Sequence, residues 1–298
     1  MDPSYLHTHL AFDDWTARRA AHKATYQAQM DAIVKRRSRH QKEPVTDFLF
    51  EYYAFRPAQF LRWSPGFGVF LEGATPEDFF FHKKLVKHPE GVYLRQMEVT
   101  QKRRRSIAWV RDLLEHVARR PPALGCFGMH EWAMVYKADA IRHENLPLRM
   151  SPEETDAFVD TRPVRCTHFD AFRFFTPPAR PKNILQPSVE NMQDLEQPGC
   201  LHTNMDLYKW AYKLYPWVGS DLIAKAYSLA LEARTLDMQA SPYDVSSVGL
   251  TPIRVETEEG RQLYQQRQES LANKSVSIRK ELIEAYTKIL EAVSLRAS

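Results

Sequence analysis

All three cysteines of this 298-residue chain precede a histidine, and an acidic residue follows each histidine. The segments are Cys126-Phe-Gly-Met-His130-Glu131, Cys166-Thr-His168-Phe-Asp170 and Cys200-Leu-His202-Thr-Asn-Met-Asp206. Thiolates, imidazoles and carboxylates bind metals, attack electrophiles and move protons. We therefore expect the three segments to meet around one site. The alternative is core packing, because free cysteine is among the most buried residue types.

One alternative function for these segments is that of a metal-dependent enzyme. Imidazoles and carboxylates are suitable ligands for iron or zinc. The candidates for a metal site of this kind are His130, Glu131, His168, Asp170, His202 and Asp206. The three cysteines with one further ligand could instead hold an iron–sulfur cluster. The sequence has no C-x-x-C pair, and Met134 stands where an H-E-x-x-H motif requires its second histidine.

The third segment also offers a candidate catalytic carboxylate. If residues 200–214 are helical, His202, Asp206 and Trp210 follow one another at intervals of four on one face. A carboxylate between an imidazole and an aromatic ring can stabilise a developing cation. Asp206 is therefore our first choice for a catalytic carboxylate, with His202 as a proton donor.

The second segment contains a second such pair. His168 and Asp170 share a face if residues 164–175 form a strand, but they do not if the segment is helical. Asp170 is our second choice for the catalytic carboxylate, with His168 as a proton donor. The alternative is that Asp170 forms a helical ion pair with Arg173.

Aromatic and cationic side chains occur close to these segments in the sequence. Aromatic rings can stack on a base, and cations can hold phosphate groups. The expected substrate-binding residues are Trp132, Tyr136, Phe172, Arg173, Arg180, Lys182, Tyr208 and Trp210. The run Lys102-Arg-Arg-Arg105 could hold phosphates as well, or it is a solvated helix face.

Positive charge is concentrated in the first part of the chain. Residues 1–120 contain 21 Lys and Arg but 14 Asp and Glu, whereas residues 121–298 contain 20 and 23. Such an excess allows DNA or a nucleotide as a partner. The phosphate-binding motifs G-x-G-x-x-G and G-x-x-x-x-G-K-[ST] are absent from the sequence, as is the hydrolase motif G-x-S-x-G.

Composition predicts a cytoplasmic protein. The odd number of cysteines argues against a framework of disulfides, and fits a reducing compartment. The first thirty residues lack the apolar core of a signal peptide, and no segment reaches the roughly 20 apolar residues of a membrane span. We expect no membrane partner, and the sequence does not indicate an oligomeric state.

The pattern of apolar residues predicts a mainly α fold of many helices with a few short strands. We expect a basic N-terminal helical segment over residues 1–44 and one mainly helical catalytic domain over 45–298. Ser151-Pro-Glu-Glu154 has the form of a capping box, which predicts a helix through Val159. The other expected elements are helices over 12–38, 45–55, 98–120, 129–138, 200–215 and 219–238, two helices after 257 broken near 273–276, and a strand at 69–71 within a loop over 64–93.

Long stretches of the chain resemble a bacterial family whose members are commonly labelled 3-methyladenine DNA glycosylase. The strings that carry the resemblance include DFLFEYY, CFGMHEWAMVYK, CTHFDAFRFFTPPARPKN, EQPGCLHTNMDLYKWAYKL and LDMQASPYDVSSVG. The similarity runs from about Val45 to near Leu282. The chain lacks the helix-hairpin-helix stretch of the well-characterised glycosylases.

The resemblance implies an N-glycosidic hydrolase that acts on a modified purine in DNA or in a nucleotide. Such an enzyme takes a base into an aromatic pocket and stabilises a sugar cation with a carboxylate. It requires no cofactor. The alternatives are the metal-dependent enzyme and a non-catalytic helical protein that binds nucleic acid.

Overall fold

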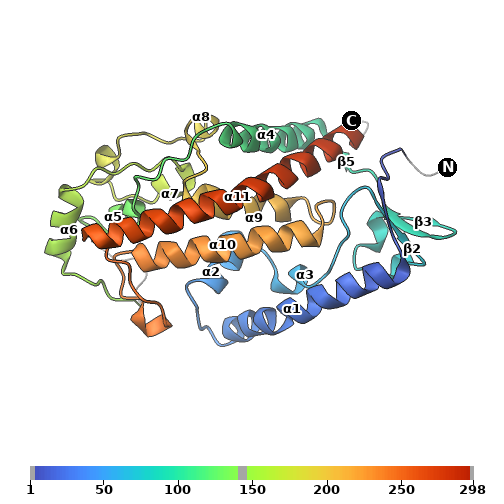
Figure 1. The fold of residues 1–298 in the computed structure, drawn as a ribbon, viewed down its shortest axis with the longest axis horizontal. Helices are drawn as coiled ribbons and strands as arrows, with labels where there is room; N and C mark the ends of the chain where they lie inside the picture. The colour runs from blue at the N-terminus through green and yellow to red at the C-terminus, as the bar shows by residue number, and fades with distance from the viewer. Residues whose placement is uncertain (1–3, 140–145, 296–298) are drawn as a thin grey trace. The chain divides into compact units, whose positions relative to one another are not determined.

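The computed structural model describes residues 4–139 and 146–295. Within these ranges the chain forms eleven α-helices and six short strands, so the expected mainly α fold is confirmed (Figure 1). The helices are α1 (Phe12–Ser38), α2 (Thr46–Tyr52), α3 (Pro57–Phe60), α4 (Gln101–Ala118), α5 (Met129–Ala133), α6 (Pro152–Asp160), α7 (Phe169–Phe172), α8 (Met192–Leu195), α9 (Leu201–Lys213), α10 (Ser220–Ala240) and α11 (Glu258–Ala292). The strands are β1 (Thr8–Leu10), β2 (Val69–Glu72), β3 (Leu85–His88), β4 (Gly91–Leu94), β5 (Glu98–Val99) and β6 (Ser294–Leu295).

The chain divides into two compact units, each made of segments that are distant in the sequence. Unit 1 consists of Met1–Leu114, Leu207–Tyr227 and Ile278–Ser298. Unit 2 consists of Glu115–Asp206 and Ser228–Ser277. Unit 1 contains residues from both sides of the boundary expected at residue 44.

The long helix α1 of unit 1 coincides with the helix expected over residues 12–38. Its first turn contains Asp13 and Asp14, and its last turn contains three cations, as the helix dipole favours. Trp15 is buried, and its indole N–H donates a 2.9 Å hydrogen bond to the carbonyl oxygen of Glu72. This bond joins the start of α1 to the end of β2.

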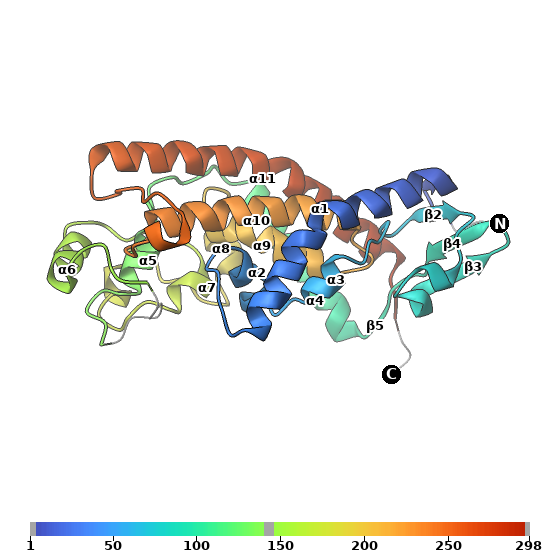
Figure 2. The same cartoon turned by 90° about the horizontal axis from the view of Figure 1, so that it is seen from below.

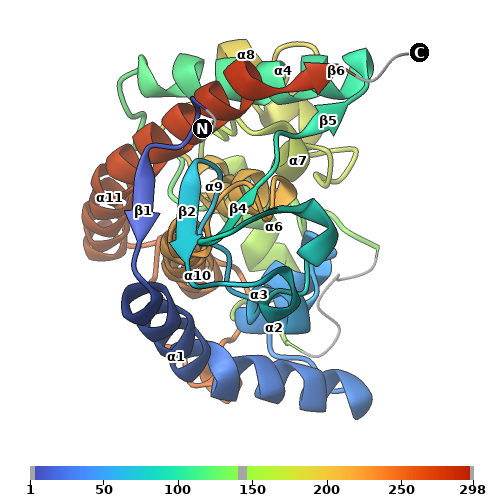
Figure 3. The same cartoon turned by 90° about the vertical axis from the view of Figure 1, so that its right-hand side faces the viewer.

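A four-stranded sheet in unit 1 corrects the expectation of a loop over residues 64–93. Its strand order is β1-β2-β4-β3, with β1 parallel to β2 and the other neighbours antiparallel (Figures 2 and 3). Strand β2 confirms the strand expected at 69–71. The glycines and prolines of this stretch suggested loop, yet Gly91 opens a strand. A Cβ on Gly91 would lie 2.0 Å from the carbonyl oxygen of Leu71, so only glycine allows this strand pairing.

Aromatic rings form the interior of unit 1. The helix expected over residues 45–55 is present as the shorter α2, in which Phe50 is fully buried. The ring centroid of Tyr227 lies 4.8 Å from that of Phe60 and 5.2 Å from that of Tyr208. Aromatic pairs at such distances stabilise a core beyond the area that they bury.

The short helices of unit 2 begin and end at local signals. Ser151 accepts a hydrogen bond from the amide of Glu154, and the Glu154 side chain accepts one in return, so the capping box of α6 is confirmed. Helix α5, which lies beside α6, is shorter than the expected 129–138. The chain continues in turns from Met134 to Lys137, whose φ of 47° does not allow a helix through residue 138.

Helix α11 is continuous, so the break expected near residues 273–276 is wrong. Ser275 is buried there, and its hydroxyl donates to the carbonyl oxygen of Ala272 at 2.7 Å. A serine bonded in this way satisfies its own side chain without ending the helix. None of the described helices has both the length and the apolar character that a membrane span requires.

Candidate functional site

Three histidines from distant segments lie together in the interior of unit 2. The ring centroid of His202 is 4.6 Å from that of His130 and 5.4 Å from that of His168. All three residues are buried. The expectation that the three Cys-His segments converge is therefore confirmed for their histidines.

A left-handed backbone turn places His130 and Glu131. Phe127 and Gly128 have φ values of 45° and 72°, and Gly128 is the N-cap residue of α5. A Cβ on Gly128 would lie 3.2 Å from the Cβ of Ala240, so the position favours glycine for space as well as for φ. The turn starts a helix of only five residues, and its second and third residues are the functional side chains.

His130 forms a buried ion pair with Asp237 of α10. Its Nε2 lies 2.7 Å from Oδ1 of the carboxylate. Burial alone would lower the pKa of His130, but the charge of Asp237 outweighs it and raises this pKa above the ordinary value. Burial would likewise raise the pKa of Asp237, yet the His130 charge holds it well below its usual range. Asp237 is therefore a carboxylate at neutral pH.

A single buried guanidinium joins two carboxylates of the cluster. Nη1 of Arg234 lies 2.6 Å from Oδ2 of Asp237 and 3.3 Å from Oε1 of Glu131. Burial and the nearby Asp237 charge raise the pKa of Glu131 to about 7. Glu131 therefore exchanges a proton near neutrality, whereas Asp237 does not.

His168 has two carboxylates on one side and a backbone amide on the other. Its Nδ1 accepts a hydrogen bond from the amide of Ala171, because His168 is the N-cap residue of α7. Nε2 therefore carries a proton, and it lies 3.4 Å from Oδ2 of Asp206 and 3.6 Å from Oε1 of Glu196. The pairing of His168 with Asp206 brings together two of the four expected catalytic residues.

His202 completes a group of metal-ligand type. One ligand atom from each of His130, His202 and Asp237 lies within 4.8 Å of the other two. Within the described part of the chain, these three residues form a group that could hold a metal ion. Burial, with the nearby His130, lowers the pKa of His202 well below the ordinary value. His202 is therefore neutral at physiological pH, which is the form that binds metals.

The cysteines lie near this cluster as neutral thiols. Burial raises the pKa of Cys126 and of Cys166, and raises that of Cys200 to about 12. The side-chain amide of Gln268 donates to the Cys126 sulfur at 3.3 Å. A thiolate is the nucleophilic form of cysteine, so these environments do not favour nucleophilic catalysis by the thiols.

The second candidate carboxylate has a local partner. Residues 169–172 are helical, so His168 and Asp170 do not share a strand face. Oδ1 of Asp170 lies 3.3 Å from Nε of Arg173, as the ion-pair alternative predicts. Arg180 donates to the carbonyl oxygen of Arg173 at 3.3 Å, and Phe172 is buried against Phe175.

Three further residues expected to bind substrate form hydrogen bonds or ion pairs with other residues of unit 2. Trp132 is fully buried and donates to the carbonyl oxygen of Ala240 at 2.9 Å. The Tyr136 hydroxyl donates to Asp160 at 2.8 Å, and Nζ of Lys182 lies 2.5 Å from the same carboxylate. The Lys182 ammonium also stands 5.0 Å from the centroid of the Tyr136 ring.

Tyr208 and Trp210 belong to unit 1. Tyr208 is a member of the aromatic core described above and is fully buried. Trp210 borders a pocket of that unit, where the ammonium of Lys213 lies 4.8 Å from its ring centroid.

Three charged residues of the cluster, Arg234, Asp237 and Glu196, are not among the site residues expected from the sequence. A signal for the first two exists: they are opposite charges three residues apart in a segment that is otherwise rich in Ala and Leu. Such a pair on an apolar helix predicts a buried ion pair. Glu196 follows α8 and shows no comparable pattern.

Comparison of the chain with protein-family models, with curated proteins and with solved structures gives no match in any of the three. The resemblance to the glycosylase-labelled family therefore stays a prediction. The site itself is a buried cluster of three histidines, four carboxylates and one arginine.

Proposed function

We propose that this protein is a metal-dependent enzyme whose centre consists of His130, His202 and Asp237. The observation that carries the proposal is the approach of one ligand atom from each residue to within 4.8 Å in the interior of unit 2. Two imidazoles and one carboxylate form a ligand set that is typical of catalytic zinc and of non-haem iron. Such a metal activates bound water or polarises a substrate oxygen.

The surroundings of the three residues support this assignment. Arg234 holds the second oxygen of Asp237, at 2.6 Å, and so fixes the orientation of the carboxylate. Partners of this kind raise metal affinity by orienting the ligands. Glu131, with a pKa of about 7, lies beside the same guanidinium and is suited to proton transfer near neutral pH.

Metal and proton compete at this site. A proton joins His130 to Asp237, and a divalent cation must displace it to bind the imidazole. Binding should therefore release a proton, and metal affinity should fall as the pH is lowered.

The experiment is an elemental analysis of the purified protein, with and without added iron and zinc. We expect about one equivalent of metal per chain in the unmodified protein, and loss of that metal in His202→Ala and in Asp237→Ala. Substitution with cobalt should give visible absorption that identifies nitrogen and oxygen ligands. The matched control is His22→Gln, because His22 is a buried histidine of unit 1 bonded to the carbonyl oxygen of Phe60 at 2.8 Å.

The control variant should keep its metal. Equal metal content in all four proteins, or no metal in any of them after loading, would contradict the proposal. Titration calorimetry in buffers of different ionisation enthalpy measures the released proton directly.

A second candidate is the N-glycosidic hydrolase that the family resemblance implies. The observation that favours it is the buried pair of His168 and Asp206, whose Nε2 and Oδ2 atoms are 3.4 Å apart. A carboxylate held in this way can stabilise a sugar cation while the imidazole donates a proton.

Release of base from alkylated DNA, measured for the unmodified protein and for Asp206→Asn, tests this candidate. We expect a loss of 10²–10³-fold or more in rate, roughly, for a residue that stabilises the transition state. Retained turnover with a lowered melting temperature would make Asp206 structural.

A further inference from the structure

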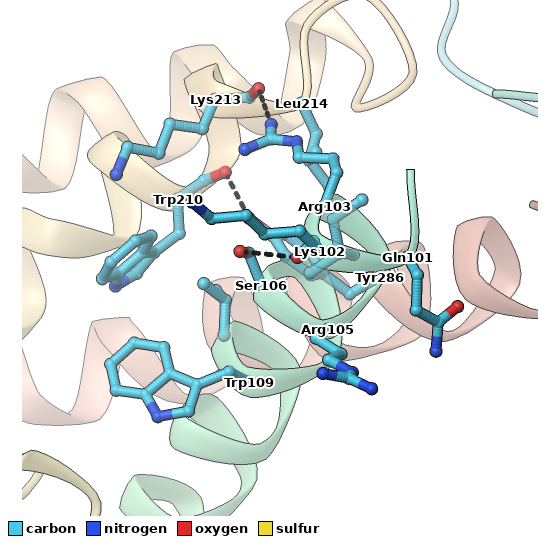
Figure 4. Close-up of a pocket in the computed structure, with 12 residues that line it drawn as sticks. Gln101, Lys102, Arg103, Arg105, Ser106, Trp109, Trp210, Lys213, Leu214 and Tyr286 are labelled. Carbon is cyan, nitrogen blue, oxygen red and sulfur yellow. Dashed lines mark hydrogen bonds between the residues drawn. The ribbon is translucent and has the colours of Figure 1, made fainter. Parts of the chain in front are cut away.

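Unit 1 contains a pocket formed by three of its helical segments. Its volume is about 880 Å³, which is within the range of small-molecule sites. The lining residues come from the first ten residues of α4, from residues 210–214 and from Tyr286 of α11. Figure 4 shows Trp109 and Trp210 at one end of the pocket, and Gln101 and Arg105 at the other.

The floor of this pocket is apolar. Ile107, Val110 and Leu214 line it and are themselves buried in unit 1. Tyr286 lines it as well, and its hydroxyl already donates a hydrogen bond to the carbonyl oxygen of Trp210 at 2.9 Å. A ligand must therefore present an apolar body to this floor, since a polar group there would lose its hydrogen bonds to water.

The rim of the pocket is cationic. Lys102, Arg103, Arg105 and Lys213 line it and are exposed, whereas none of the described lining residues is acidic. The guanidinium of Arg103 on α4 donates a 3.4 Å hydrogen bond to the carbonyl oxygen of Lys213, the last residue of α9, and so joins the two helices beside the pocket. A lining that contains four cations and no carboxylate attracts an anionic head group.

The tryptophans do not offer a platform for a stacked base. Trp210 is only 7% exposed, and the ammonium groups of Lys209 and Lys213 lie 4.3 and 4.8 Å from its ring centroid. Trp109 is inclined to it by 69°, so the two rings cannot sandwich a flat ligand. A flexible chain follows such an irregular apolar floor better than a nucleobase does.

From these features we infer that the pocket binds an amphipathic organic anion, namely an alkyl or acyl chain that ends in a phosphate or carboxylate. The chain lies along Ile107, Val110 and Leu214, and the head group contacts Lys102 and Arg105. This inference is independent of the metal centre, because all residues of the pocket belong to unit 1. It also assigns a role to Lys102 and Arg105 of the basic run 102–105.

The test measures binding of decyl phosphate, below its micelle-forming concentration, by calorimetry and tryptophan fluorescence. We expect saturable binding of one equivalent, with at least tenfold weaker binding of decanol and of inorganic phosphate. Decanoate should bind with an affinity within a fewfold of that of decyl phosphate if the pocket recognises the charge of the head group. A tenfold preference for one of the two compounds shows whether the natural ligand ends in a phosphate or in a carboxylate. The double variant Lys102→Glu/Arg105→Glu should bind decyl phosphate at least tenfold more weakly.

The matched control is Arg104→Glu. Arg104 lies in the same basic run, but it is not among the residues that line the pocket, so its reversal should change affinity less than twofold. If the double variant fails to fold, Trp109→Ala still tests the apolar part of the pocket, and the comparison of decyl phosphate with decanol still tests the cationic rim.

The inference would be overturned if decanol or inorganic phosphate bound as tightly as decyl phosphate, or if Arg104→Glu weakened binding as much as the double variant does. Tighter binding of AMP than of decyl phosphate, or binding to phosphatidylglycerol vesicles alone, would overturn it in favour of a nucleotide or a membrane surface.

Discussion

Nε2 of His130 lies 2.7 Å from Oδ1 of Asp237, and both side chains are almost completely removed from solvent. The two residues are 107 positions apart in the chain. The same carboxylate is held by Arg234 through its other oxygen. Asp237 is therefore the shared anion of two buried cations, and the interior of unit 2 depends on it.

Replacement of Asp237 by Asn should destabilise the protein strongly. The change leaves His130 and Arg234 with less negative charge in a buried setting, and the loss of one partner of a buried ion pair typically costs about 3–5 kcal/mol. The free energy of unfolding in urea measures the effect. Glu281→Gln is the control, because its pair with Lys225 is exposed and such pairs contribute about 1 kcal/mol or less. A loss as small as that of the control would show that Asp237 does not anchor the cluster.

Glu131→Gln should change how stability depends on pH. The pKa of Glu131 is about 7 in the folded protein but 4.5 for an unperturbed glutamate, so the folded state keeps a proton that the unfolded state has lost. The unmodified protein therefore loses stability as the pH rises from about 4.5 through 7, by at most about 1.4 kcal/mol per pH unit. The variant is neutral throughout, so its stability relative to the unmodified protein should rise between pH 5 and pH 7. Unfolding curves at pH 5, 6, 7 and 8 measure this difference, and parallel profiles would contradict it.

Removal of metal should lower the melting temperature if the proposed centre is correct. A ligand that binds only the folded state at 100 times its dissociation constant stabilises it by about 2.7 kcal/mol. Treatment with a chelator should remove that stabilisation, and iron or zinc should restore it. His202→Ala should show no shift with chelator or metal. Asp170→Asn should behave as the unmodified protein does, because Asp170 pairs with Arg173 outside the proposed ligand group.

The cysteines should resist modification in the folded state. Cys166 and Cys200 are buried, and burial raises the pKa of each of the three thiols. Reaction with a disulfide reagent requires the thiolate and access to it, so at pH 8 it should proceed no faster than unfolding does. A stopped-flow assay with and without denaturant compares the two rates. Rapid reaction of Cys126 alone would show that its contact with Gln268 opens readily.

Local signals in the sequence predicted the elements that depend on local interactions. The capping box at Ser151 and the strand at 69–71 are confirmed because each is determined by a few adjacent residues. Strands β3 and β4 were not predicted because their pairing depends on neighbours in space: position 91 requires glycine only because the carbonyl oxygen of Leu71 lies beside it. The continuity of α11 was missed because a buried serine can satisfy its hydroxyl within the helix.

In the candidate site, too, only the features that depend on neighbouring residues in the sequence could be predicted. The spacing of cysteines and histidines predicted that His130, His168 and His202 meet, and their rings do lie together. Their acidic partners could not be read from that spacing. Neither His130 nor His168 pairs with the acidic residue that follows it closely, since His130 pairs with Asp237 and His168 with Asp206.

The discontinuous make-up of the two units has a consequence for synthesis of the chain on the ribosome. Ribosomes add about 5–20 residues per second, so His130 emerges roughly 5–20 s before Asp237. Unit 1 combines Met1–Leu114 with Ile278–Ser298, so it too lacks a segment until residues beyond 277 have been made. Neither unit can complete its interior until a segment more than 20 residues further along the chain than its preceding one has been made. Nascent chains should therefore remain open to proteases and chaperones until these later segments have emerged, and a protein truncated before residue 278 should accumulate poorly in cells.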